Sequence, residues 1–148
     1  HTITGGVTLT AAGTIYPLMS IRLKSTRLNG IAVPVNYDVL PLGSGNYRYV
    51  IYTGNTTGGT WVDPGSSSIV EYNLNPTSIN SGNTVVETGF ISATNQSSGG
   101  RGSNDTPFKY QLERNSFTST ATEFIIAVAT DAVNSPKAVA SINWQEIT

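Results

Sequence analysis

Apolar and polar residues alternate along most of this chain with a period of two, the pattern of half-buried β-strands. Thr2–Thr10 alternates isoleucine, glycine, valine and leucine with threonine, and Lys137–Ile147 alternates alanine, isoleucine and tryptophan with polar residues. No window of a dozen residues repeats apolar positions at the three- and four-residue spacing of an amphipathic helix. The chain is therefore expected to be all-β.

Nine to ten short strands are expected, at a spacing of roughly 8 to 14 residues, with turn-forming residues between them. The expected strands are Thr2–Thr10, Ile15–Leu28, Ile31–Leu40, Asn46–Thr53, Thr60–Val62, Ser68–Leu74, Thr84–Ser92, Phe108–Glu113, Glu123–Thr130 and Lys137–Ile147. Residues 93–106 are rich in Ser, Gly and Asn and are expected to form a long exposed loop. This pattern in 148 residues predicts one domain, residues 1–148, folded as an antiparallel β-sandwich, jelly-roll-like.

Three of these strands carry a more specific expectation, and a fourth stays ambiguous. Glu123–Thr130 is apolar on both phases, which indicates a central strand covered on both faces. Pro17 favours an edge position or a bend near the start of its strand, because proline donates no ladder hydrogen bond. Trp144 shares a phase with Ala140 and Ile142 and is assigned to the core. In Thr84–Ser92 both phases hold apolar residues, so the sequence does not show which face of this strand is buried.

Composition narrows the range of functions. Ser, Thr, Asn and Gly make up 64 of the 148 residues, and the chain has 17 charged side chains, one His, no Cys and a net charge of -1. The densest basic stretch is Arg22, Lys24 and Arg27, too little to track phosphates, so no nucleic acid is expected as a partner. No run approaches the ~18 apolar residues of a membrane span, so no membrane partner is expected either. The chain begins with His1 rather than Met, which suggests a processed product or part of a longer chain.

The same inventory argues against an enzyme. His1 is the single histidine and the first residue, a poor position for a catalytic triad, and neither a Gly-x-Ser-x-Gly nor a His-Glu-x-x-His motif occurs. Four carboxylates are expected on strands: Glu71, Glu87, Glu113 and Glu123. Any two of them lying close together would suffice for glycoside hydrolysis, but solvent-exposed strand positions explain these residues more simply. Asp63 and Asp105 lie in loops of a kind that can wrap a cation, but turn chemistry is the favoured interpretation. No cofactor and no metal are expected.

Two binding hypotheses remain. Trp61, together with Tyr47 and Tyr49 on one strand face, would make a stacking platform for sugar rings, whereas core or rim packing is the competing explanation. The stretch 1–12, through Ile3, Val7 and Leu9, would be an assembly strand that completes a neighbour's sheet, whereas an ordinary first strand is the simpler alternative.

Three segments together resemble a β-rich domain of virion structural proteins of tailed bacteriophages. They are Ile15–Lys24 (IYPLMSIRLK), Gly59–Asp63 with Ser68–Tyr72 (GTWVD and SIVEY), and Ala138–Glu146 (AVASINWQE). These patterns are similar to a "YPLxSIRLK"-like strand, a "TWxxV…SSxVEY"-like middle and a closing "ASxNWxE" strand. Trp61 and Glu71 match the middle pattern, and Trp144 and Glu146 match the closing one.

The resemblance implies an exposed virion component, such as a head fibre, a capsid decoration protein or a tail-fibre domain. Such a protein would assemble with copies of itself as a trimer or symmetric array, and with other capsid or tail proteins. Two alternatives stay open. One is a carbohydrate- or receptor-binding module that contacts host-surface glycans, and the other is an extracellular cell-surface filament subunit joined by donor-strand exchange through residues 2–9.

Overall fold

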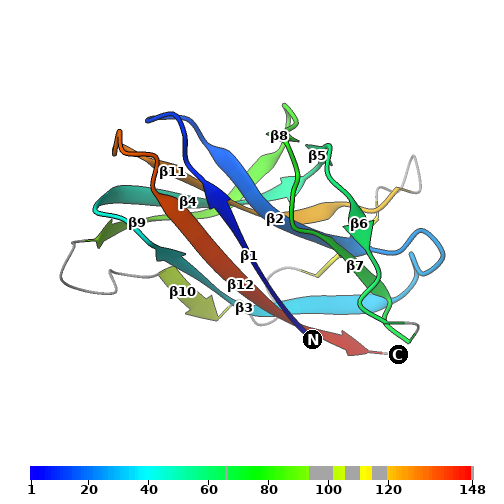
Figure 1. The fold of residues 1–148 in the computed structure, drawn as a ribbon. Helices are drawn as coiled ribbons and strands as arrows, with labels where there is room; N and C mark the ends of the chain where they lie inside the picture. Colours follow the sequence, from blue (N-terminus) through cyan, green and yellow to red (C-terminus); the bar gives the residue numbers. More distant parts are fainter. Residues whose placement is uncertain (66, 94–101, 106–110, 115–119, 148) are drawn as a thin grey trace.

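The computed structural model describes residues 1–65, 67–93, 102–105, 111–114 and 120–147, which form twelve strands arranged as an antiparallel β-sandwich (Figure 1). The larger sheet has the strand order β6-β7-β2-β11-β4-β9, the smaller one has the order β1-β12-β3-β10, and β5 and β8 form a separate pair. The strands are β1 (Thr2–Thr8), β2 (Tyr16–Leu23), β3 (Ile31–Pro41), β4 (Gly45–Gly54), β5 (Thr56–Thr57), β6 (Trp61–Val62), β7 (Val70–Asn73), β8 (Ser78–Ile79), β9 (Thr84–Ala93), β10 (Gly102–Asp105), β11 (Glu123–Thr130) and β12 (Lys137–Ile147).

The strand pairing is nested from the ends of the chain inward. β1 pairs with β12, β2 with β11, β3 with β10 and β4 with β9, all antiparallel. Two further antiparallel pairs, β12 with β3 and β11 with β4, join these four pairs into two sheets. This is the double-sheet topology of a jelly roll, so the predicted fold class is confirmed.

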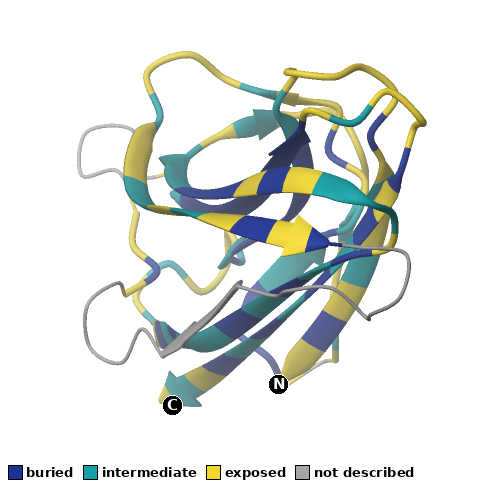
Figure 2. Ribbon diagram, turned by 90° about the vertical axis from the view of Figure 1, so that its left-hand side faces the viewer, coloured by how far each residue is buried: buried dark blue, intermediate teal, exposed yellow. Residues whose placement is uncertain are grey.

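The core lies between the two sheets and is built mainly from alternate residues of the longer strands (Figure 2). Phe124, Ile126 and Val128 of β11 point into it, and the strand's other phase is buried as well, as the apolar run predicted. Trp144 on β12 is 2% exposed, which confirms its assignment to the core. Each such apolar side chain contributes roughly 1.5–3 kcal/mol of burial free energy.

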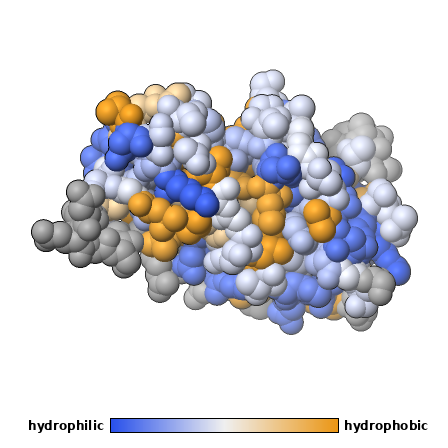
Figure 3. All heavy atoms as spheres, viewed as in Figure 1, coloured by the Kyte–Doolittle hydropathy of each residue, from blue (hydrophilic) through white to orange (hydrophobic). Residues whose placement is uncertain are grey.

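The open side of the sandwich between β1 and β7 is also filled by side chains. Leu74 and Met19 pack over Gly5, where an added Cβ would lie 3.0 Å from Leu74 Cδ2. Hydrophobic residues are visible in the middle of this face, with hydrophilic residues around them (Figure 3). The small glycine on β1 therefore allows the segment after β7 to close the core on this side.

Three β-bulges shift the burial phase within strands. In β2 the register jumps at Leu18, next to Pro17, which pairs with Ala127 of β11 but lies beyond the part of β2 that pairs with β7. In β3 the jump falls at Val35, next to Pro34, and in β9 it falls at Val86. A bulge leaves one residue outside the ladder, and this position accommodates a proline within a sheet. Pro17 therefore has a ladder partner on one side only, and the expected irregularity near the start of its strand is this bulge.

Residues 55–83 form an insertion in the jelly roll between β4 and β9, which we call the excursion. Within this excursion, β7 adds to the larger sheet beside β2, β6 forms its outer edge, and β5 pairs with β8. Glu123 of β11 is 3% exposed and anchors the start of the excursion. Its carboxylate accepts hydrogen bonds from Thr56 N at 2.9 Å and from Thr56 Oγ1 at 2.6 Å.

The described structure differs from the expected strands in three places. Gly102–Asp105 is strand β10, although the stretch 93–106 was expected to be an exposed loop; residues 94–101 and 106 lie outside the described residues. The expected strand Phe108–Glu113 is not seen in its described part, residues 111–113. The two-residue strands β5 and β8 are additional. β10 lacks the apolar alternation because its backbone pairing with β3 needs no apolar side chain.

Gly89 on β9 is required by the packing of Tyr49. The two residues are directly opposed in the β4–β9 ladder, and a Cβ on Gly89 would lie 2.4 Å from the Tyr49 hydroxyl oxygen. The Tyr49 ring is held from its other side by Tyr37, with ring centroids 5.9 Å apart at 62°. The Tyr49 ring therefore has little room to move away.

We expect Gly89→Ala to lower the free energy of unfolding by about 1–3 kcal/mol, because it overpacks this contact. Urea denaturation followed by fluorescence measures the change. If the Tyr49 ring is the cause, the same substitution made in a Tyr49→Ala background will cost much less. Equal costs in the two backgrounds would contradict this explanation.

Candidate functional site

The expected aromatic platform is not assembled. Tyr47 and Tyr49 of β4 are 1% and 8% exposed and face the core, whereas Trp61 lies on β6, at the edge of the same sheet. Strands β11, β2 and β7 separate β4 from β6. The prediction that these three residues form one stacking surface is therefore wrong. Alternation placed the tyrosines on a common face, but it did not tell which face the second sheet covers.

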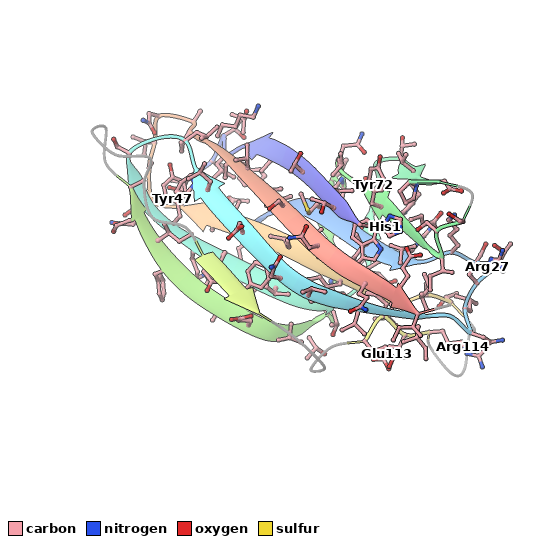
Figure 4. All side chains as sticks on the ribbon, turned by 90° about the horizontal axis from the view of Figure 1, so that it is seen from below. His1, Arg27, Tyr47, Tyr72, Glu113 and Arg114 are labelled. Atoms are coloured by element: carbon pink, nitrogen blue, oxygen red, sulfur yellow. The ribbon has the colours of Figure 1, made fainter. Side chains whose placement is uncertain are left out.

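Tyr47 has a structural role at the turn between β3 and β4, at the opposite end of the sandwich from His1 (Figure 4). Its hydroxyl donates a hydrogen bond to the carbonyl oxygen of Gly43 at 2.7 Å. Burial raises the pKa of Tyr47 above its ordinary value, although the hydrogen bond to Gly43 acts in the opposite direction. The residue therefore stays neutral and fastens the turn.

Trp61 is held in a ladder of charged side chains on the outer surface of the larger sheet. The Arg22 guanidinium lies 3.8 Å from the Trp61 ring centroid and donates from Nε to Glu71 Oε1 at 2.6 Å. Lys24 Nζ donates to Asp63 Oδ1 at 2.7 Å beside it. One face of the Trp61 ring is thus occupied by Arg22, and the ladder joins β6, β7 and β2.

Glu146, near the end of β12, collects the densest set of hydrogen bonds. Its carboxylate accepts from Ser68 Oγ at 2.5 Å, from Ile69 N at 3.0 Å and from Trp144 Nε1 at 2.9 Å. The His1 imidazole stacks on Trp144 with ring centroids 5.4 Å apart, and its Nε2 lies 3.7 Å from Glu146 Oε1. Ser68 bonds to the carboxylate rather than to His1, so the group ties β12 to the segment before β7.

The electrostatic consequence of this cluster is a low pKa for Glu146. Burial of the carboxyl group would by itself raise the pKa. The hydrogen bonds from Ser68, Trp144 and Ile69, together with the N-terminal charge, outweigh burial and hold the pKa of Glu146 below its ordinary value. Sequence reasoning matched Glu146 to a strand pattern but found no contact for it, because two of its three partners, Ile69 and Ser68, are 77 and 78 residues away.

The strand carboxylates do not form a catalytic pair in the described structure. Glu71 is engaged by Arg22 on β2, Glu123 is enclosed and bonded to Thr56, and Glu87 lies on β9, at the opposite edge of the sheet from β6. Glu113 lies outside the strands.

Among the described residues no group of three His, Asp or Glu side chains could hold a metal ion. Asp63 accepts a hydrogen bond from Gly65 N at 2.8 Å in addition to its contact with Lys24, as expected of turn chemistry. These contacts lower the pKa of Asp63, the hydrogen bond from Lys24 most strongly. Asp105 belongs to β10 and pairs in register with Asn36.

The expected assembly strand is part of its own sheet. β1 pairs with β12 over residues 2–8, and Ile3 and Leu9 are buried in the core, with Val7 packed against it. The hypothesis that Ile3, Val7 and Leu9 complete a neighbour's sheet required a strand without a partner in its own chain. The structure gives β1 such a partner, so this expectation is corrected to an ordinary first strand.

The two outer faces of the sandwich differ in chemistry. On the smaller sheet a polar row crosses β1, β12 and β3, where Thr2 Oγ1 bonds to Asn143 and Asn143 Nδ2 bonds to Asn36. On the larger sheet, edge strand β9 instead exposes apolar side chains. Phe90 is 82% exposed and Val85 is 51% exposed. We call Val85, Thr88 and Phe90 the β9 face; they oppose the outward residues of β4.

A groove of about 570 Å³ lies between the excursion and the larger sheet. One side is formed by residues 14–17 and by Tyr52 of β4, and the other by residues 77–80, 82 and 83. Sequence reasoning missed this groove because its walls come from three segments far apart in the chain. The Asn-Ser-Gly-Asn turn at 80–83 was a visible signal of a tight turn, but nothing located its neighbours.

Comparisons with known proteins found no match: no family model, no curated protein and no solved structure matches this chain. The described residues include no helix long and apolar enough to cross a membrane.

We expect Glu146→Gln to lower the free energy of unfolding at pH 7 by about 1–3 kcal/mol, since the buried acceptor loses its charge-assisted bonds. A group with a lowered folded-state pKa stabilises above its unfolded-state pKa, and this stabilisation disappears as the pH falls through the folded-state value. The difference between wild type and variant should therefore shrink below about pH 4.3, the ordinary Glu value.

Urea denaturation at a series of pH values measures this difference. Glu113→Gln is the matched control, because Glu113 is exposed, and it should change stability by less than about 0.5 kcal/mol. A wild-type minus Glu146→Gln difference that stays constant between pH 7 and pH 3 would contradict the assigned role of the Glu146 carboxylate.

Proposed function

We propose that the chain is a non-enzymatic structural domain of a tailed-phage virion, exposed on the particle surface and assembled with copies of itself. The segments that carry the resemblance support this proposal because they contact one another. Arg22 of the first segment bonds to Glu71 and stacks on Trp61 of the second, and Glu146 of the third bonds to Ser68 and Ile69 of the second. The shared patterns thus coincide with contacts that shape the fold.

The jelly-roll topology adds a weaker argument, because this fold recurs in viral capsid domains and also in lectins. A fold alone does not assign a function, so this argument is one of analogy. It is compatible both with a virion role and with a carbohydrate-binding role.

The observation that carries the proposal is the β9 face. Among the described strands β9 pairs with β4 alone, so its second edge offers unpaired backbone groups to another chain. Phe90 projects from this strand with most of its ring in water, beside Arg48 and Ala129. A soluble β-protein usually protects such an edge with charge or proline. A second copy of this chain would cover both the ring and the backbone edge.

The surface next to Phe90 is suited to contact with a second copy of the chain. A cavity of about 350 Å³ lies there, lined by Phe90, Ala129, Tyr47 and residues of the turn at Thr130 and Asp131. In a symmetric assembly the same patch contributes both the projecting ring and the receiving surface. An aromatic anchor in a pocket is the usual centre of a protein interface.

We expect Phe90→Ser to weaken self-association at least about tenfold, because it removes the anchor of the interface. Sedimentation velocity over a concentration series measures the association. Val133→Ser is the control, because Val133 is 90% exposed but lies in the turn between β11 and β12. A wild-type protein that stays monomeric at high concentration, or equal effects of the two substitutions, would contradict assembly through the β9 face.

The virion role itself is tested by electron microscopy of source particles labelled with an antibody against this domain. We expect regular labelling on the outside of the head or tail, since the polar outer face of the smaller sheet would point to solvent. Particles without label, from a preparation in which the protein is present but sediments separately, would refute the virion assignment.

A further inference from the structure

The groove between the excursion and the larger sheet carries no formal charge. Its lining consists of Thr14, Ile15, Tyr16, Pro17, Tyr52, Thr77, Ser78, Ile79, Asn80, Gly82 and Asn83. Its volume of about 570 Å³ falls within the range of small-molecule sites, roughly 300–1,000 Å³. A ligand bound there would meet rings, methyl groups, hydroxyls and amides, but no ion.

Tyr52 of β4 supplies the aromatic surface of the groove, and Tyr16 of β2, across β11 from it, borders the groove while its side chain packs against the core. The Tyr16 hydroxyl is fixed by Thr10 Oγ1 at 2.9 Å and by Ala11 N at 2.9 Å, so its ring is held in place. Tyr52 projects from the outer phase of β4, opposite Ile125 of β11. Tyrosine rings of this kind offer an apolar face with a polar tip, which suits a ligand with both apolar and hydroxyl surfaces.

Several polar groups in the groove have no partner among the described residues. They include the hydroxyls of Tyr52, Ser78 and Thr14, while the Asn80 side chain accepts a bond from Thr57 Oγ1 through Oδ1 and keeps its Nδ2 donors. Hydroxyl groups both donate and accept hydrogen bonds. Together with an amide donor, they match the alternating donors and acceptors of a sugar's hydroxyl groups.

The far wall of the groove is pre-organised. Asn83 Oδ1 accepts from Asn55 N at 2.9 Å, Asn83 Nδ2 donates to Asn55 O at 2.9 Å, and Thr77 N donates to Thr57 O at 2.8 Å. Gly82 adopts a φ of 87°, which a residue with a side chain rarely takes, and so permits the tight turn of this wall. A rigid wall lowers the entropy lost when a ligand binds.

We propose that this groove binds a neutral carbohydrate, with the Tyr52 ring and hydroxyl as its main contact. The absence of Lys and Arg from the lining disfavours phosphorylated and acidic ligands, which require a positive partner. The groove lining does not include Val85, Thr88 or Phe90 of the β9 face, although Val85 stands opposite Tyr52 in the β4–β9 ladder. Binding here goes beyond assembly and would give an exposed domain a contact with a glycosylated surface.

The test is retention on a printed array of neutral and acidic oligosaccharides, followed by titration calorimetry with the best neutral oligosaccharide. We expect binding to neutral glycans, a loss of at least about tenfold in affinity for Tyr52→Ala, and a smaller loss for Tyr52→Phe, which keeps the ring. Far-ultraviolet circular dichroism and urea denaturation establish that each variant is folded. Asn80→Ala provides a second variant on the opposite wall, where a smaller but measurable loss is expected.

Phe90→Ser separates this inference from the proposed assembly, because it should retain full glycan affinity whatever it does to self-association. Absence of binding to every neutral glycan, preference for acidic glycans, or unchanged affinity in folded Tyr52→Ala protein would each overturn the carbohydrate assignment. These results would leave the sedimentation outcome for Phe90→Ser unaffected.

Discussion

The insertion of the last two strands between the first four is the constraint on which the whole structure depends. β11 lies between β2 and β4, and β12 lies between β1 and β3, so each sheet is completed by the end of the chain. β11 can occupy the middle of the larger sheet because all eight of its residues are buried, with apolar side chains on both faces. Without these two strands, β1 and β3 have no common neighbour, and neither have β2 and β4.

Six of the 17 charged side chains attach the excursion to this jelly roll. Glu123 holds its beginning through Thr56, Arg22 and Lys24 hold its middle through Glu71 and Asp63, and Glu146 holds the segment before β7. Partly buried pairs with good geometry and additional hydrogen bonds are the kind that fix one arrangement.

The groove and the β9 face, which lie away from these ion pairs, carry few charges. The groove lining has no ionic group, and the cavity beside Phe90 has two, Arg48 and Asp131. The groove and the β9 face differ mainly in the polarity of their side chains. Hydroxyls and amides line the groove, whereas the β9 face presents an aromatic ring.

The sequence was a better guide to the long strands than to the faces that they bury. Alternation located most strands of the jelly roll to within a few residues, and the apolar run at 124–129 identified the central one. The bulges at Leu18, Val35 and Val86 were invisible, because an extra residue changes the buried phase without changing composition. This is why β9 was ambiguous, with Phe90 outward and Ile91 inward. Tyr47 and Tyr49 were misplaced for a related reason: a strand's two faces look alike until the second sheet is known.

The nested pairing also sets a delay between the synthesis of an early strand and the synthesis of its partner strand. β2 ends at Leu23 and its partner β11 begins at Glu123, so at roughly 5–20 residues per second the ribosome takes roughly 5–20 s to deliver the partner. During this interval the early strands cannot complete either sheet, and unpaired strand edges are prone to aggregate. Threonine, serine, asparagine and glycine are abundant in the first 122 residues, and β11, whose residues are all buried, is made after its neighbours β2 and β4.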